Sequence, residues 1–185
     1  MCKDIKQFRK RLLHLLKDKA FKRGRFILSS GKVGSYYIDA RSITLSAEGA
    51  YLVAYLILDL IKNEKIDAVG GPTFGADPIV GAVAVLSYTL KKPLKTFIIR
   101  KEAKAHGTKR QVEGPPLKRG SRVILVDDVV TTGKSFLESI KILRQKGLQV
   151  KKAIALVDRQ EGAKEILAKE ACPLISLFTI ADFNP

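Results

Sequence analysis

One stretch of the sequence decides the fold, namely Arg122-Val123-Ile124-Leu125-Val126-Asp127-Asp128-Val129-Val130-Thr131-Thr132-Gly133-Lys134-Ser135. Its apolar beginning is typical of a buried β-strand. Two adjacent carboxylates end that run, and a Thr-Thr-Gly-Lys-Ser segment leads into a helical pattern. Acids at the end of a buried strand are costly unless hydroxyls, cations or a metal offset them. Backbone N–H groups at a helix N-terminus favour a bound phosphate. The stretch therefore predicts a strand–loop–helix unit suited to a phosphorylated sugar and a metal.

The same alternation of strands and helices continues on both sides of this stretch. Short apolar runs predict strands at 68–70, 96–99, 123–126 and 153–157, and helical periods predict helices at 78–90, 133–146 and 162–169. This order is typical of an α/β fold, a parallel sheet flanked by helices, which binds ligands at the carboxyl ends of its strands.

The N-terminal part of the chain has a different pattern. It predicts a helix over 4–19 that is broken at Gly24, short strands at 26–28 and 36–39, and an apolar helix over 47–63. We expect a single domain over residues 1–185, with about residues 1–45 forming an N-terminal helix and a small cap.

The composition excludes several classes of protein. With 46% hydrophobic and 28% charged residues, the chain is expected to fold. No apolar run approaches the ~20 residues of a membrane span, and the N-terminus does not read as a signal peptide. Cys2 and Cys172 show no metal or redox spacing. A soluble, cytoplasmic protein is the simplest expectation.

The net charge is +16, from 34 basic and 18 acidic residues, and it is concentrated in two segments. Residues 1–25 hold ten basic and two acidic side chains, and residues 100–122 hold eight and two, which gives +8 and +6. Such a chain attracts anions, whether nucleic acid, a membrane surface or phosphorylated metabolites. Composition does not choose among them.

Two simpler interpretations account for the deciding stretch less well. Asp128 and Thr132 could merely cap the following helix, but capping explains one acid and not the second acid or the Thr-Thr-Gly-Lys-Ser run. A Walker P-loop requires a glycine five residues before Gly133, where the sequence has Asp128.

The stretch resembles the 5-phosphoribosyl-1-pyrophosphate (PRPP) motif of the type I phosphoribosyltransferases. In that family the two acids hold the ribose hydroxyls, and the loop from Thr131 to Ser135 wraps the 5′-phosphate. The resemblance implies that PRPP contacts Asp127, Asp128, Val129, Val130, Thr131, Thr132, Gly133, Lys134 and Ser135. It also implies Mg²⁺, held mainly by PRPP itself and possibly near the two acids.

A second motif lies in the basic segment after the predicted strand 96–99. Four side chains, Arg100, Lys101, Lys104 and His106, crowd into seven residues. The segment could be a solvated surface loop, as most charge runs are, but a pyrophosphate leaving group needs such cations. The pattern Arg-Lys-x-x-Lys-x-His-Gly resembles the catalytic loop of the orotate phosphoribosyltransferase family. The resemblance implies that all four residues are catalytic and bind PRPP. Lys101 would serve its own site and the other three the neighbouring subunit's site, in a homodimer with shared active sites.

Three shorter segments resemble the same family in order along the chain. The run Ser29–Asp39 matches its N-terminal Tyr-Tyr-Ile-Asp motif, although Ser29 and Gly34 depart from the usual residues. The glycines of 70–77 resemble its pyrophosphate loop, although turn chemistry before a helix is an equally good account of them. Arg159 resembles the arginine that pairs with the base, since a guanidinium matches a carboxylate or carbonyl edge. A surface salt bridge is the simpler alternative. The resemblance implies orotate contacts from Tyr37, Ile38, Thr131 and Arg159.

Together these motifs imply an enzyme that joins orotate to PRPP and releases pyrophosphate. Purine or uracil relatives are disfavoured by the His106 loop and by Arg159. The rival from another class is a non-catalytic regulator on the same fold, which binds PRPP or nucleic acid. The +8 charge of residues 1–25 gives this rival some weight. On balance, neither a membrane nor a nucleic acid is expected as a partner.

Overall fold

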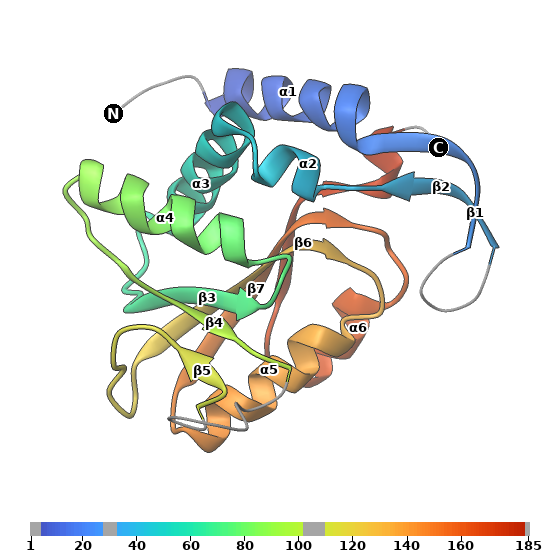
Figure 1. Cartoon of the computed structure of the whole chain (residues 1–185). Coiled ribbons are helices and arrows are strands. Elements are labelled where there is room, and N and C mark those ends of the chain that lie inside the picture. Colours follow the sequence, from blue (N-terminus) through green and yellow to red (C-terminus); the bar gives the residue numbers. More distant parts are fainter. Residues whose placement is uncertain (1–4, 28–32, 102–109, 184–185) are drawn as a thin grey trace.

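The computed structural model of the chain describes residues 5–27, 33–101 and 110–183 (Figure 1). A six-stranded sheet has the order β5-β4-β3-β6-β7-β8, and only β5 runs antiparallel to its neighbour. Its strands are β3 (Ala68–Pro72), β4 (Lys95–Ile99), β5 (Val112–Glu113), β6 (Arg122–Val130), β7 (Gln149–Asp158) and β8 (Leu174–Thr179). The predicted α/β fold with a parallel sheet is confirmed. Strands β5 and β8 were not foreseen.

Helices cover both faces of this sheet (Figure 1). On one face lie α1 (Ile5–Leu15), α2 (Arg41–Thr44), α3 (Ala47–Ile61) and α4 (Asp77–Thr89), and on the other α5 (Lys134–Gln145) and α6 (Ala163–Lys169). Side chains alternate between the two layers because successive strand residues point to opposite faces. Ile124 and Val126 pack with α3 and α4, whereas Val123 and Leu125 pack with α5. Each apolar run therefore contributes to two cores.

The strand of the deciding stretch is longer than its apolar run predicts. Strand β6 continues to Val130, so Asp127 and Asp128 lie inside the strand and not just after it. The reason is its neighbour β7, which stays paired with β6 as far as Val130 and Asp158. On the other side, the pairing with β3 ends at Leu125. The last five residues of β6 therefore have a paired strand on one side only, and their other edge is not paired with a strand.

The N-terminal helix belongs to the main core. After α1 the chain forms a π-helical turn, Leu16–Ala20, and then the antiparallel pair β1 (Phe21–Ile27) and β2 (Val33–Ile38). Leu12 and Leu16 are fully buried in the same core as α3. The prediction that Gly24 breaks the helix is wrong. The helix gives way to β1 after Ala20, whose carbonyl accepts a hydrogen bond from Asp39 N at 2.9 Å. Gly24 lies inside β1, at a shift in its register with β2.

Candidate active site

Two adjacent carboxylates form the centre of the site. Asp128 N donates to Asp127 Oδ1 at 2.9 Å, and Val129 N donates to Asp128 Oδ1 at 2.7 Å. Burial raises the pKa of Asp127 well above its usual range, and the negative charge of Asp128 raises it further. Burial also raises the pKa of Asp128, against a smaller opposing effect of the Val129 N–H. Such a pair gains most from hydroxyl donors or from a divalent cation.

The phosphate loop, residues 131–135, follows directly from these acids and opens helix α5. It lines a small cavity of about 60 Å³ together with Asp127. Gly133 precedes the helix in the left-handed region, with φ 79°, a conformation that favours glycine. The first N–H groups of an α-helix lack partners within the helix and carry its positive dipole end. The cavity therefore suits an oxyanion such as a phosphate.

Arg159 directly follows the carboxyl end of β7, next to the end of β6. Its backbone N–H donates to Val130 O at 3.0 Å, which ties it to the end of β6. Its Nε donates to Tyr36 Oη at 3.3 Å, its Cζ lies 5.0 Å from the centre of the Tyr36 ring, and its Nη2 is 3.0 Å from Glu161 Oε1. The side chain is only 14% exposed. The guanidinium is thus held in one place, with donors left for a further acceptor.

Two residues expected to contact the base, Ile38 and Tyr37, lie in different surroundings. Ile38 lines a cavity of about 250 Å³ that also includes Asp128 and Gly75. Tyr37 instead packs on Phe26, with their ring centres 5.6 Å apart. Its neighbour Tyr36, which the sequence did not single out, contacts Arg159 because adjacent strand residues point to opposite faces.

The glycine segment before α4 comes close to the acid pair. A Cβ added to Gly75 would collide with the Oδ1 atoms of both Asp127 and Asp128. The charge of Asp77 contributes to the raised pKa of Asp127, and burial raises the pKa of Asp77 itself. The glycines of this segment were equally well explained by turn chemistry. Only the tertiary structure shows that Gly75 keeps a side chain away from the acids.

Arg41 is a further cation at the site that the sequence did not single out. It lines the same cavity as Asp128 and lowers the pKa of that carboxyl, in opposition to burial. Its Nε is 3.5 Å from Asp39 Oδ1. The only signal in the sequence was its place two residues after the Tyr-Tyr-Ile-Asp motif.

Two of the four predicted loop cations are in the described part of the chain. Arg100 and Lys101 line a cavity of about 290 Å³ with Thr73 and Ser135. The buried Arg100 Nε has no hydrogen-bond partner among the described residues. Lys104 and His106 lie outside the described residues, so their predicted roles stay predictions.

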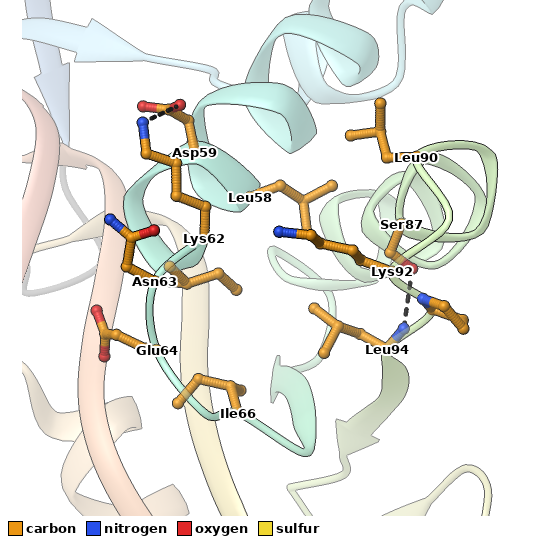
Figure 2. Close-up of a pocket in the computed structure, with 12 residues that line it drawn as sticks. Leu58, Asp59, Lys62, Asn63, Glu64, Ile66, Ser87, Leu90, Lys92 and Leu94 are labelled. Carbon is orange, nitrogen blue, oxygen red and sulfur yellow. Dashed lines mark hydrogen bonds and ion pairs between the residues drawn. The ribbon is translucent and has the colours of Figure 1, made fainter. Parts of the chain in front are cut away.

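A larger cavity, about 610 Å³, lies away from these residues, between the last turns of α3 and α4 (Figure 2). Its floor is apolar, and three of its charged side chains are already paired, Lys62 with Asp59 at 3.0 Å and Glu64 with Lys152 at 2.6 Å. Lys92 reaches across the cavity from the opposite side (Figure 2). None of the predicted site residues lines it. We therefore place the active site at the acid pair.

Comparison with known proteins agrees with this placement. The family model of the phosphoribosyl transferase domain matches residues 42–178, which include the acid pair, the phosphate loop and Arg159. Fold and site thus define a phosphoribosyltransferase. The chain is 48% identical over 180 residues to the orotate phosphoribosyltransferase of Synechocystis sp., covering 97% of this chain and 90% of that protein.

Solved structures point to the same family. The chain resembles the orotate phosphoribosyltransferase of Mycobacterium tuberculosis H37Rv in complex with Fe(III) dicitrate, with a TM-score of 0.85 and 34% identity, over 96% of this chain and 99% of that one. The structure of that enzyme in complex with PRPP has a TM-score of 0.80 and 30% identity over the same shares. The chain belongs to the orotate phosphoribosyltransferase family. The family predicted from the loop motifs is therefore confirmed.

Among the described residues, no helix is both long and apolar enough to span a membrane.

Proposed function

We propose that the chain transfers ribose 5-phosphate from PRPP to orotate, which yields orotidine 5′-monophosphate and pyrophosphate in pyrimidine nucleotide biosynthesis. One observation carries the proposal. The acid pair, the phosphate loop and Arg159 meet at the carboxyl ends of the adjacent strands β6 and β7. These groups suit, in turn, ribose hydroxyls, a phosphate and an anionic base. Relatives named orotate phosphoribosyltransferase agree with the proposal.

The ribose 5-phosphate is proposed to lie along the open edge of β6. Asp127 and Asp128 would accept hydrogen bonds from the ribose hydroxyls. The phosphate loop would donate backbone and hydroxyl hydrogen bonds to the 5′-phosphate at the start of α5. Two carboxylates beside the sugar would also stabilise positive charge that develops on it as the glycosidic bond breaks. Both roles follow from the chemistry of the side chains and from their order along β6.

Orotate is proposed to pair with Arg159. A guanidinium fork can bind a carboxylate or a carbonyl edge with two parallel hydrogen bonds. Tyr36 and Glu161 orient the fork, so little conformational entropy is lost on binding. Ile38 and Thr131 remain the neighbouring candidates, since Ile38 lies in the cavity beside Asp128. Tyr37 stays a proposed orotate contact on the strength of the sequence motif alone.

Mg²⁺ fits the acid pair, because both carboxyls have a raised pKa that a cation would oppose. Among the described residues, however, no group of three or more His, Cys, Asp or Glu side chains could hold a metal. Most of the oxygen ligands would therefore come from PRPP itself, with Asp127 and Asp128 nearby. When bound, the ion would neutralise the pyrophosphate and fix its orientation.

Arg100, Lys101, Lys104 and His106 are proposed to stabilise the departing pyrophosphate, with Lys104 or His106 as proton donor. Arg100 and Lys101 share a cavity with Thr73 and Ser135, which lie at the pyrophosphate segment and at the phosphate loop. We also propose a cytoplasmic setting, in keeping with the buried free thiol of Cys172.

A homodimer with shared sites is proposed for this enzyme. Helix α4 exposes two apolar side chains, Val85 and Tyr88, which are 70% and 71% exposed, and Phe74, three residues before the helix, is 78% exposed. Exposed apolar side chains of this size favour burial against another copy. If Lys104 acts in the partner's site, mixing Lys104→Ala with Asp128→Asn subunits should restore about a quarter of wild-type activity, from hybrids with one intact site. Activity that stays at the level of the single variants would refute the sharing of sites.

The assay for the reaction follows the loss of orotate's ultraviolet absorbance with PRPP and Mg²⁺, with uracil, adenine and hypoxanthine in parallel. Loss with orotate alone, abolished by chelation of Mg²⁺, would support base and reaction together. No loss of absorbance with any base, despite PRPP binding, would refute catalysis and favour a non-catalytic regulator.

A further inference from the structure

The catalytic proposal leaves the positive charge of the N-terminal segment unexplained. From Lys6 to Arg25 the chain carries nine basic side chains and one acid, Asp18. All nine basic residues are exposed, namely Lys6, Arg9, Lys10, Arg11, Lys17, Lys19, Lys22, Arg23 and Arg25. We name this surface the basic ridge. Figure 1 shows α1, its first element, on the far side of the sheet from α5 and α6.

Part of the ridge is already occupied within the chain. Arg11 forms two hydrogen bonds with Glu48, at 2.7 and 2.9 Å, and the Arg9 guanidinium lies 4.7 Å from the centre of the Phe178 ring. Within the described residues, Lys10, Lys17 and Arg25 have no ion pair. These cations are therefore available to an external anion.

The shape of the ridge distinguishes between kinds of anion. Lys6, Lys10 and His14 lie four residues apart on one face of α1, and Lys17 follows in the π-helical turn. At a rise of 1.5 Å per residue, the part of this row on α1, from Lys6 to His14, is about 12 Å long, with its first two members about 6 Å apart. A row along an exposed helix does not converge on one small anion. It matches a linear chain that presents a negative charge every few ångströms.

An anionic membrane surface fits the ridge less well. Helices that lie in a membrane bury an exposed apolar face in it. The apolar face of α1 is already used, because Leu12, Leu15 and Leu16 are buried in the protein core. Only the charged face is left for a partner.

We propose that the basic ridge binds a single-stranded nucleic acid through its phosphate backbone, independently of base sequence. This revises the expectation that nucleic acid is no partner of the chain. The expectation rested on the catalytic motifs, which lie outside α1 and β1. The ridge adds an electrostatic contact on another part of the surface.

The test measures the fluorescence anisotropy of a labelled uridine 20-mer RNA, with PRPP and Mg²⁺ in excess to occupy the catalytic site. The test variant reverses two unpaired members of the row, Lys10→Glu with Lys17→Glu. The matched control makes the same charge change on α6, Lys164→Glu with Lys169→Glu, where both lysines are exposed. Inorganic polyphosphate and phosphatidylserine vesicles serve as separate probes.

The row variant should bind the RNA at least about tenfold more weakly than wild type, and the control should change affinity less than about twofold. The slope of log K against log salt should flatten by about 1.4 in the row variant, from about 0.7 for each lost phosphate contact. Both variants should keep the catalytic rate, because neither pair lies in the active site.

Three results would overturn the proposal. These are no RNA binding by wild type at low salt, an equal loss in the control variant, or a row variant without catalytic activity. Tighter binding of polyphosphate than of RNA would assign the ridge to free polyphosphate instead. Vesicle binding without RNA binding would assign it to a membrane.

Discussion

Replacement of Arg159 by lysine should damage orotate recognition and spare PRPP recognition. The guanidinium is oriented by Tyr36 Oη at 3.3 Å and by Glu161 Oε1 at 3.0 Å, and it lies over the Tyr36 ring. Lysine keeps the positive charge, but it cannot form the planar two-donor contact with a carboxylate or a carbonyl edge.

The size of the effect follows from the lost hydrogen bond. A charge-assisted hydrogen bond contributes about 1.5–3 kcal/mol. If the ammonium retains one of the two bonds to orotate, the loss is about 2 kcal/mol, or about 30-fold in kcat/KM for orotate. Tyr36→Phe provides a graded control. It keeps the ring that stacks on Phe21 and faces Arg159, and it removes one orienting hydrogen bond, so about a two- to fivefold loss is expected.

Steady-state kinetics with each substrate varied in turn would measure both variants. The expected result for Arg159→Lys is a large rise in KM for orotate and a nearly unchanged KM for PRPP. An unchanged KM for orotate, or an equal rise for both substrates, would refute the placement of the base at Arg159. A loss in Tyr36→Phe as large as in Arg159→Lys would show that the tyrosine hydroxyl itself contacts the substrate.

Three further predictions follow from the geometry. Asp127→Asn should cut turnover at least about 100-fold yet raise the melting temperature. Because the pKa of Asp127 is raised in the folded protein, the wild type loses stability as the pH rises from about 4 through that pKa. The difference in melting temperature between Asp127→Asn and wild type should therefore widen over this pH window, in melts recorded at stepped pH. A constant difference would contradict the burial of Asp127. Gly75→Ala should abolish most turnover, because the added Cβ would collide with Asp127 and Asp128. The circular dichroism spectrum should stay near-native. A near-normal kcat would show that the two acids move aside freely. Burial raises the pKa of Cys172 to about 11. In a Cys2→Ser variant, Ellman's reagent at about pH 8 should therefore label Cys172 only as fast as the protein unfolds. Fast labelling of the native protein would contradict the burial of Cys172.

The sequence predicted the elements whose pattern is local and periodic. The buried runs at 68–70, 96–99, 123–126 and 153–157 became β3, β4, β6 and β7, because only a parallel sheet covered on both faces buries continuous apolar strands. The short β5, with two residues, carries no such periodic signal. Its assignment depends on the hydrogen bonds that it forms with β4, which no local pattern contains.

The boundaries of the elements depend on contacts that a local sequence pattern does not contain. The apolar run of β6 ends at Val126, but its pairing with β7 extends the strand to Val130 and carries Asp127 and Asp128 into it. Likewise Gly24 suggested a helix break, whereas pairing with β2 placed it inside β1. Strand length depends on a neighbour that is distant in the sequence.

By itself, the sequence determined the fold class and the family, and it predicted the chemistry of the acid pair, the phosphate loop and Arg159, because each depends on residues that are close together along the chain. Only the tertiary structure decided which side chains meet across the sheet. It brought Tyr36, and not Tyr37, to Arg159, 123 residues away, and set Gly75 against the acid pair. Such contacts arise from strand register and from the packing of α4 on the sheet, which depend on the whole folded chain.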